Sequence, residues 1–98
     1  MEKQIEIKEY ALAQLKEEYE YYKWEYSADY AEKFRSDFFD EIENIAANYM
    51  IFSECRFIPS KGKKYRNVVW GNYLIIFKIK SIGIEILSLF HTKRNTKD

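Results

Sequence analysis

A chain of 98 residues, 47% of them hydrophobic, can bury one core but not two, so we expect a single domain over residues 1–98. The lone Cys55 excludes an internal disulfide, and the charged first twenty residues exclude a signal peptide or membrane span, as expected of a cytoplasmic protein with no membrane partner. The net charge is zero, but residues 1–55 carry six Lys or Arg and fourteen Asp or Glu, whereas residues 56–98 carry ten and two, which favours an anionic partner for the basic C-terminal part.

The sequence begins with a predicted strand and a predicted helix. Residues 3–8 alternate, with Ile5 and Ile7 on one face, which is the two-residue period of a half-buried strand. From Glu9 the apolar residues recur at three or four positions, which predicts an amphipathic helix. Its apolar face is expected to hold Leu12, Leu15, Tyr19 and Tyr22.

A second helix is predicted to begin near Ala28. Ser27 can act as its N-cap, and Asp29 places a favourable negative charge in the first turn. Its apolar positions are Ala31, Phe34, Phe38, Ile42, Ile45 and Tyr49. Two helices joined so closely form a hairpin, which needs a further layer of structure to bury its apolar face.

The rest of the chain predicts a loop and an antiparallel meander. Residues 50–62 lack periodicity and contain the only proline, so we expect a loop that contacts the core through Phe52 and Phe57. The strands are expected at residues 65–70, 73–80 and 84–90, with turns at Gly71-Asn72 and residues 81–83, and a polar, basic tail follows at residues 91–98. In the last strand, Leu87 and Leu89 are expected on the face opposite Ile84 and Ile86.

These elements predict an α+β fold in the order β-α-α-β-β-β, with the N-terminal strand and the helical hairpin packed on one face of an antiparallel sheet. The segment from Tyr73 to Phe77 is apolar at every position, so burial is expected on both faces of the sheet. The face away from the hairpin should therefore present an open apolar groove, with Trp70, Tyr73, Ile75 and Phe77 as binding residues. Monomers seldom expose such a surface, so we expect a protein partner to cover it.

The order of elements and three motifs resemble the RelE/ParE family of toxins over nearly the whole chain. The motifs are Tyr65-Arg66, Gly71-Asn72-Tyr73 and the run from Ile84 through His91 to Arg94. The resemblance implies a growth-inhibiting toxin of a type II toxin-antitoxin system, of the kind linked to plasmid stabilization. It also implies a cognate antitoxin, commonly an acidic or amphipathic segment that wraps the toxin, and such a segment would suit both the groove and the basic part of the chain.

Family members differ in their target. RelE-like toxins are ribosome-dependent mRNA endoribonucleases that use Lys and Arg around the scissile phosphate, whereas ParE-like toxins inhibit DNA gyrase. This chain has Val69 and Trp70 where the nucleases tend to carry Arg, Leu74 where many members carry Arg, and no Tyr after Phe77. Its ending resembles that of ParE, so we favour gyrase as the target, with the ribosome and its mRNA, or a non-toxic binding domain, as alternatives.

The basic residues late in the chain are the predicted target-binding residues. They are Lys63, Lys64, Arg66, His91, Lys93 and Arg94. If the chain is a nuclease, His91 and Arg66 are the expected catalytic residues. Apart from the resemblance, His91 is more simply a surface residue at a strand end, and Arg66 is equally well explained by a cross-strand ion pair with Glu85.

Aromatic residues make up 18% of the chain, and several lie in or near the first helix. They are Tyr19, Tyr21, Tyr22, Trp24 and Tyr26, and Trp70 is a further large ring. They can stack on nucleobases, or they can pack in the core and contact the antitoxin, which we favour because most lie on the apolar face of the helix. One His and one Cys without paired spacing cannot complete a metal site, so we expect no metal and no cofactor.

Overall fold

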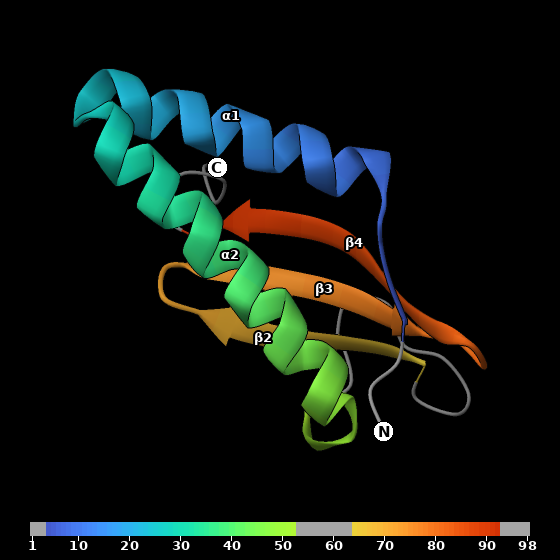
Figure 1. The fold of residues 1–98 in the computed structure, drawn as a ribbon. Coiled ribbons are helices and arrows are strands. Elements are labelled where there is room, and N and C mark those ends of the chain that lie inside the picture. Colours follow the sequence, from blue (N-terminus) through green and yellow to red (C-terminus); the bar gives the residue numbers. More distant parts are fainter. Residues whose placement is uncertain (1–3, 53–63, 93–98) are drawn as a thin grey trace.

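The computed structural model describes residues 4–52 and 64–92 and has two helices on one face of a four-stranded sheet (Figure 1). The elements are β1 (Gln4–Ile7), α1 (Glu9–Glu25), α2 (Ala28–Asn48), the short 3₁₀ helix η1 (Tyr49–Ile51), β2 (Tyr65–Trp70), β3 (Tyr73–Ile79) and β4 (Gly83–His91). The α+β class and the element order are those predicted. Neither α1 nor α2 combines the length and apolarity needed to cross a membrane.

The sheet has the strand order β1-β4-β3-β2. Strands β2, β3 and β4 form the predicted antiparallel meander, but β1 lies within the sheet as an edge strand, parallel to β4, and not on its face. An alternating pattern identifies a strand without identifying its neighbour, and the intervening hairpin is long enough to connect parallel strands. Gly83 allows this pairing, because a Cβ there would lie 2.6 Å from the backbone oxygen of Gln4.

A β-bulge in β4 changes which of its residues face the helices. Ile76 is opposite Ser88 while Phe77 is opposite Ile86, so Leu87 has no partner in the register. Leu89 therefore returns to the helix-facing side together with Ile86 and joins the core. The prediction that Leu89 faces away from Ile86 was wrong, because simple alternation does not survive a bulge.

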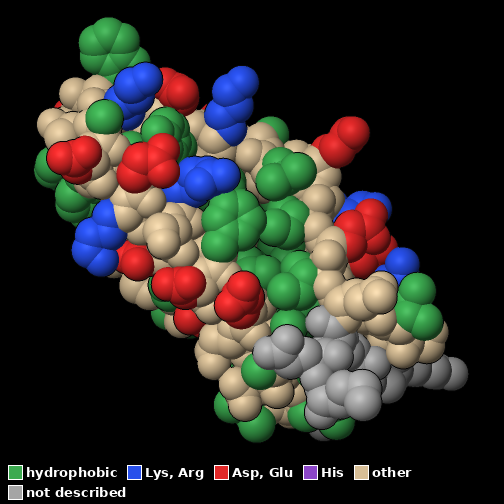
Figure 2. Space-filling model, viewed as in Figure 1, with side chains coloured by type: hydrophobic (Ala, Val, Ile, Leu, Met, Phe, Trp, Pro, Cys, Tyr) green, Lys and Arg blue, Asp and Glu red, His purple; other side chains and the backbone are tan. Residues whose placement is uncertain are grey.

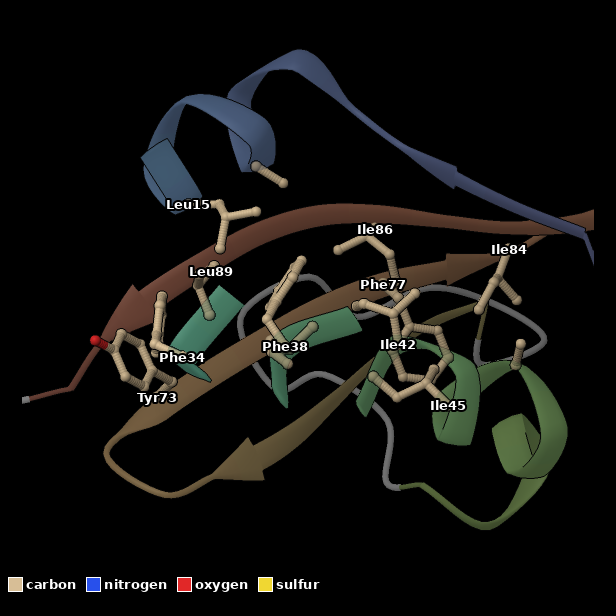
Figure 3. Packing of buried hydrophobic residues seen from close by; sticks show 13 residues of the cluster. Leu15, Phe34, Phe38, Ile42, Ile45, Tyr73, Phe77, Ile84, Ile86 and Leu89 are labelled. Atoms are coloured by element: carbon tan, nitrogen blue, oxygen red, sulfur yellow. The ribbon is translucent and has the colours of Figure 1, made fainter. Parts of the chain in front are cut away.

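Helix α2 supplies most of the helical side of the core. Ser27 caps it by accepting a hydrogen bond from the Tyr30 N–H at 3.0 Å, as predicted. The buried residues include the predicted Ala31, Phe34, Phe38, Ile42 and Ile45. Figure 3 shows Phe34, Phe38, Ile42 and Ile45 of α2 packed against the sheet residues Phe77, Ile84, Ile86 and Leu89.

Helix α1 is rotated relative to its predicted orientation. Ala11 and Leu15 are buried, whereas Leu12 is 44% exposed. The side facing the sheet also carries two polar residues, Gln14 and Glu18, that bond to the sheet. Sequence reasoning that weighed hydrophobicity alone placed Leu12 inward and left both polar residues out.

The open apolar groove predicted for the sheet is not present at its centre. Tyr73, Ile75 and Phe77 are at most 5% exposed and belong to the core beneath the helices. On the opposite face, Ile76 is also buried, so the apolar run is covered on both sides. The apolar strand correctly predicted burial on both faces of the sheet. The further prediction that one of these faces is an exposed groove was wrong.

Candidate functional site

The two residues predicted as catalytic lie at different ends of the sheet. His91 is opposite Tyr73 in the register, and Arg66 is opposite Phe77, which is four residues further along β3. At about 3.3 Å per residue, this separation is roughly 13 Å. His91 and Arg66 therefore do not form one site.

Arg66 anchors the chain that leaves α2. Its Nη1 donates to the backbone oxygens of Met50 at 2.9 Å and Phe52 at 3.1 Å. Phe52 also packs edge-on against Phe77 with ring centroids 5.9 Å apart. The predicted core contact of Phe52 is confirmed, while Phe57 and Cys55 lie outside the described residues.

The predicted ion pair between Arg66 and Glu85 is wrong. Glu85 accepts a hydrogen bond from Lys80 at 2.8 Å, and Lys8 lies 4.0 Å from the same carboxylate oxygen. The hydrogen bond from Lys80 holds the pKa of Glu85 below its ordinary value, and the same bond raises the pKa of Lys80. In the register, Arg66 is opposite Phe77, whereas Glu85 is opposite Lys78, the next residue of β3. Neighbouring positions along a strand point to opposite faces, so the side chains of Arg66 and Glu85 lie on opposite faces of the sheet.

His91 is buried rather than displayed at the surface. His91 is only 9% exposed. The Tyr73 ring stands edge-on to its imidazole ring, with centroids 5.0 Å apart. The interpretation of His91 as an exposed residue at a strand end was therefore wrong. Of the other predicted target-binding residues, Lys64 is exposed just before β2, whereas Lys63, Lys93 and Arg94 lie outside the described residues.

Tyr73 and Trp70 belong to a cleft at the end of the sheet that carries His91. The cleft has a volume of about 260 Å³ and lies between the helical hairpin and the turn from β2 to β3. We call it the aromatic cleft, and its rings are Tyr22, Tyr30, Phe34, Trp70 and Tyr73. Lys33, Asp37, Gly71 and Asn72 complete its lining.

The rings of the aromatic cleft pack against one another. Phe34 is stacked on Trp70 with centroids 5.6 Å apart, and it lies 5.3 Å from Tyr73. Tyr22 lies 5.2 Å from Tyr30 and 4.9 Å from Phe34. These separations fall within the range of favourable aromatic pairs, so the rings form a continuous wall from α1 through α2 to the sheet.

A chain of hydrogen bonds holds the base of the aromatic cleft. Tyr73 donates its hydroxyl proton to Glu18 at 2.7 Å, so the 2.6 Å contact between the Tyr22 and Tyr73 hydroxyls uses the Tyr22 proton. Burial, followed by the bond to Tyr22, raises the pKa of Tyr73 well above its ordinary value. Burial also raises the pKa of Tyr22, so both phenols are neutral at physiological pH.

The rim of the aromatic cleft is polar. Lys33 and Asp37 form an exposed ion pair at 3.1 Å along α2. Gly71 adopts a φ of 60° in the turn, and the Asn72 backbone oxygen accepts from the Thr92 N–H at 2.7 Å and the Thr92 hydroxyl at 2.9 Å. The turn is therefore fixed to the end of β4.

A second concave surface lies between α1 and α2, which diverge from their connection (Figure 1). Figure 2 shows hydrophobic side chains gathered in this space. We call it the interhelical groove; its volume is about 510 Å³, and it is lined by Leu12, Leu15, Lys16, Tyr19, Glu32 and Arg35. Tyr19 donates to Glu32 at 2.6 Å across the groove, and the Arg35 guanidinium lies 5.3 Å from the centroid of the Phe39 ring.

Comparison with known proteins agrees with the fold. A model of the family described as "ParE toxin of type II toxin-antitoxin system, parDE" matches residues 5–96. A solved structure described as "Chromosomal ParDE TA system from P. aeruginosa" superposes with a TM-score of 0.74, at 18% sequence identity, over 91% of this chain and 95% of that chain. At this identity the superposition shows a shared fold. No curated protein matches the chain significantly.

Proposed function

Because the chain belongs to the ParE toxin family of type II toxin-antitoxin systems, we propose that it inhibits growth by binding DNA gyrase and not by cleaving RNA. The observation that carries this choice is the separation of His91 and Arg66. Cleavage of RNA needs a base, an acid and cations around one phosphate. His91 is buried against Tyr73, and Arg66 donates to two backbone carbonyls roughly 13 Å along the sheet at about 3.3 Å per residue.

The target-binding surface in this proposal is the basic part of the chain. Of the predicted target-binding residues, Lys64 is exposed in the part of the chain that the structure describes, and Lys63, Lys93 and Arg94 belong to the proposal from the sequence alone. Arg66 and His91 are proposed to support this surface from within the fold. Cationic side chains at a surface would favour an acidic face of the target.

The cognate antitoxin is proposed to cover the interhelical groove. Leu12, which lines this groove, is 44% exposed, and Figure 2 shows apolar side chains gathered between the two helices. Lys16 lies on one side and Arg35 on the other, and neither forms an ion pair with a carboxylate among the described residues. An amphipathic helix with acidic residues beside its apolar face fits this arrangement, and the family resemblance implies an antitoxin segment that is acidic or amphipathic.

The antitoxin site can be tested in bacteria. Induction of the chain alone should arrest growth, and coexpression of the neighbouring open reading frame should relieve the arrest. Leu12→Glu should keep the arrest but abolish the relief, because it places a charge beside the apolar side chains of the interhelical groove. Ala13→Glu, at an exposed position next to it, is the matched control and should still be neutralised. Normal growth with the wild-type chain would contradict toxicity. Full neutralisation of Leu12→Glu would contradict the proposal that the antitoxin binds in the interhelical groove.

The target can be tested with purified components. We expect the chain to inhibit supercoiling by gyrase and to leave mRNA intact in a reconstituted ribosome reaction. Cleavage of mRNA with undisturbed gyrase activity would overturn the proposed target in favour of the ribosome-dependent nuclease. A chain that does neither would fit the non-toxic binding domain.

A further inference from the structure

The aromatic cleft has the dimensions of a site for a single side chain. Its volume of about 260 Å³ lies below the roughly 300–1,000 Å³ of pockets that hold drug-sized ligands. Phe34 and Tyr73 are buried and lie at its base, whereas Tyr30 is 48% exposed and Trp70 is partly exposed. Tyr22 is partly exposed as well, so the exposed ring surface comes from three different elements, α1, α2 and β2.

The chemistry of this lining selects a planar cation. The faces of aromatic rings carry negative potential and attract cations that come within about 6 Å of the ring centroid. The exposed Tyr30 adds a hydroxyl oxygen that can accept a hydrogen bond, and the Asp37 carboxylate lies at the rim. A guanidinium group can stack on a ring with its face while its edge donates several hydrogen bonds, which a compact ammonium group cannot do.

The charge around the cleft favours the same guest. Two carboxylates lie close to the cleft: Asp37 in its lining and Glu18, which accepts a hydrogen bond from the Tyr73 hydroxyl at 2.7 Å. A nucleotide would bring phosphates close to these carboxylates, so base stacking on the rings is opposed by repulsion. The ion pair of Lys33 with Asp37 shows that a cation already occupies part of the rim. Because the Lys33 side chain is 75% exposed and the Asp37 side chain 46% exposed, Asp37 can exchange this partner for another.

We propose that the aromatic cleft binds an arginine side chain presented by a basic segment of a partner protein. The arginine would lie between Tyr30 and Trp70, with its edge toward Asp37. The aromatic cleft shares no lining residue with the interhelical groove, so this site is additional to the one proposed for the antitoxin. It also does not depend on gyrase being the target, because binding is measured on the purified chain.

Tryptophan fluorescence provides a direct test. The chain has two tryptophans, Trp24 and Trp70, so Trp24→Phe leaves only the ring that lines the cleft. This protein is titrated with a short uncharged peptide that contains one central arginine. Parallel titrations use the same peptide with lysine, the same peptide with citrulline, which has the shape of arginine without its charge, and adenosine monophosphate.

We expect saturable binding of the arginine peptide, and at least about tenfold weaker binding of the citrulline peptide and the nucleotide. Tyr30→Ala should weaken arginine binding by about fivefold to tenfold, because it removes one exposed ring. Tyr10→Ala removes an exposed tyrosine from the other end of α1 and should leave binding unchanged. The melting temperature of each variant is measured to confirm that it is folded.

Three results would overturn the proposal. Equal binding of the arginine and citrulline peptides would exclude a role for the charge. Tighter binding of the nucleotide would assign the cleft to a base, and the absence of any saturable change would mean that the cleft holds neither.

Discussion

Gln14 allows the packing of α1 on the sheet to be tested by one substitution. Its side-chain oxygen accepts a hydrogen bond from the Leu89 N–H at 2.7 Å. Leu89 lies in the part of β4 that continues past the residues paired with β1. The bond is part-buried, so removing this acceptor leaves the Leu89 N–H with only partial access to water. Gln14→Met keeps the length of the side chain and its helix propensity but removes the acceptor.

The cost follows from the unsatisfied donor. A buried N–H without a partner costs about 1–3 kcal/mol, and in a domain of this size each kcal/mol lowers the melting temperature by about 4–8 °C. Because the Leu89 N–H is only part-buried, we expect Gln14→Met to lower the free energy of unfolding by about 1 kcal/mol and the melting temperature by roughly 4–8 °C. The control is Glu17→Met, at an exposed position on the same helix, which should change stability by less than about 0.5 kcal/mol. Equal melting temperatures for the two variants would show that the hydrogen bond from Leu89 to Gln14 does not stabilise the fold.

Three further predictions concern the sheet. Gly83→Ala should weaken the pairing of β1 with β4, because the new Cβ would lie 2.6 Å from the Gln4 backbone oxygen. Hydrogen exchange at the Lys8 N–H, which donates to the Ile86 oxygen of β4, should accelerate, and an unchanged exchange rate would contradict this. The pKa of Glu85 is lowered, so its contribution to stability should be complete above the ordinary pKa of Glu and disappear as pH falls through the lowered pKa. Denaturant titrations of Glu85→Gln at several pH values should lack this pH dependence of stability. Arg66→Met should lower the melting temperature by removing two hydrogen bonds to carbonyls, and a change no larger than that of the exposed Lys64→Met would argue against the anchoring role.

Local signals predicted the elements of this fold well. The N-cap at Ser27 and the apolar face of α2 depend on neighbouring residues, and both are confirmed. The parallel pairing of β1 and the bulge at Leu87 depend on contacts between distant segments, and alternation along a strand does not reveal them. The orientation of α1 was missed because its sheet-facing side includes Gln14 and Glu18, whose hydrogen bonds with Leu89 and Tyr73 stabilise a polar side chain against the sheet.

The candidate sites were less accessible from sequence. Arg66 and His91 were grouped because both are cationic or titratable residues late in the chain, but the register places them at different ends of the sheet. The aromatic cleft combines α1, α2 and the turn after β2, so its residues are up to 51 positions apart, as in the contact of Tyr22 with Tyr73. A useful signal was available in the sequence, because the tyrosines near the helix connection exceed what a small core requires.

Under the proposed function, the chain acts on gyrase by binding, and His91 is a structural residue. The most direct measurement is gyrase supercoiling in the presence of purified His91→Phe, which keeps a ring beside Tyr73 but cannot transfer a proton. With equal amounts of folded protein, we expect the variant to inhibit supercoiling as the wild-type chain does. Wild-type cleavage of ribosome-bound mRNA that disappears in His91→Phe, with gyrase unaffected by either protein, would contradict the account.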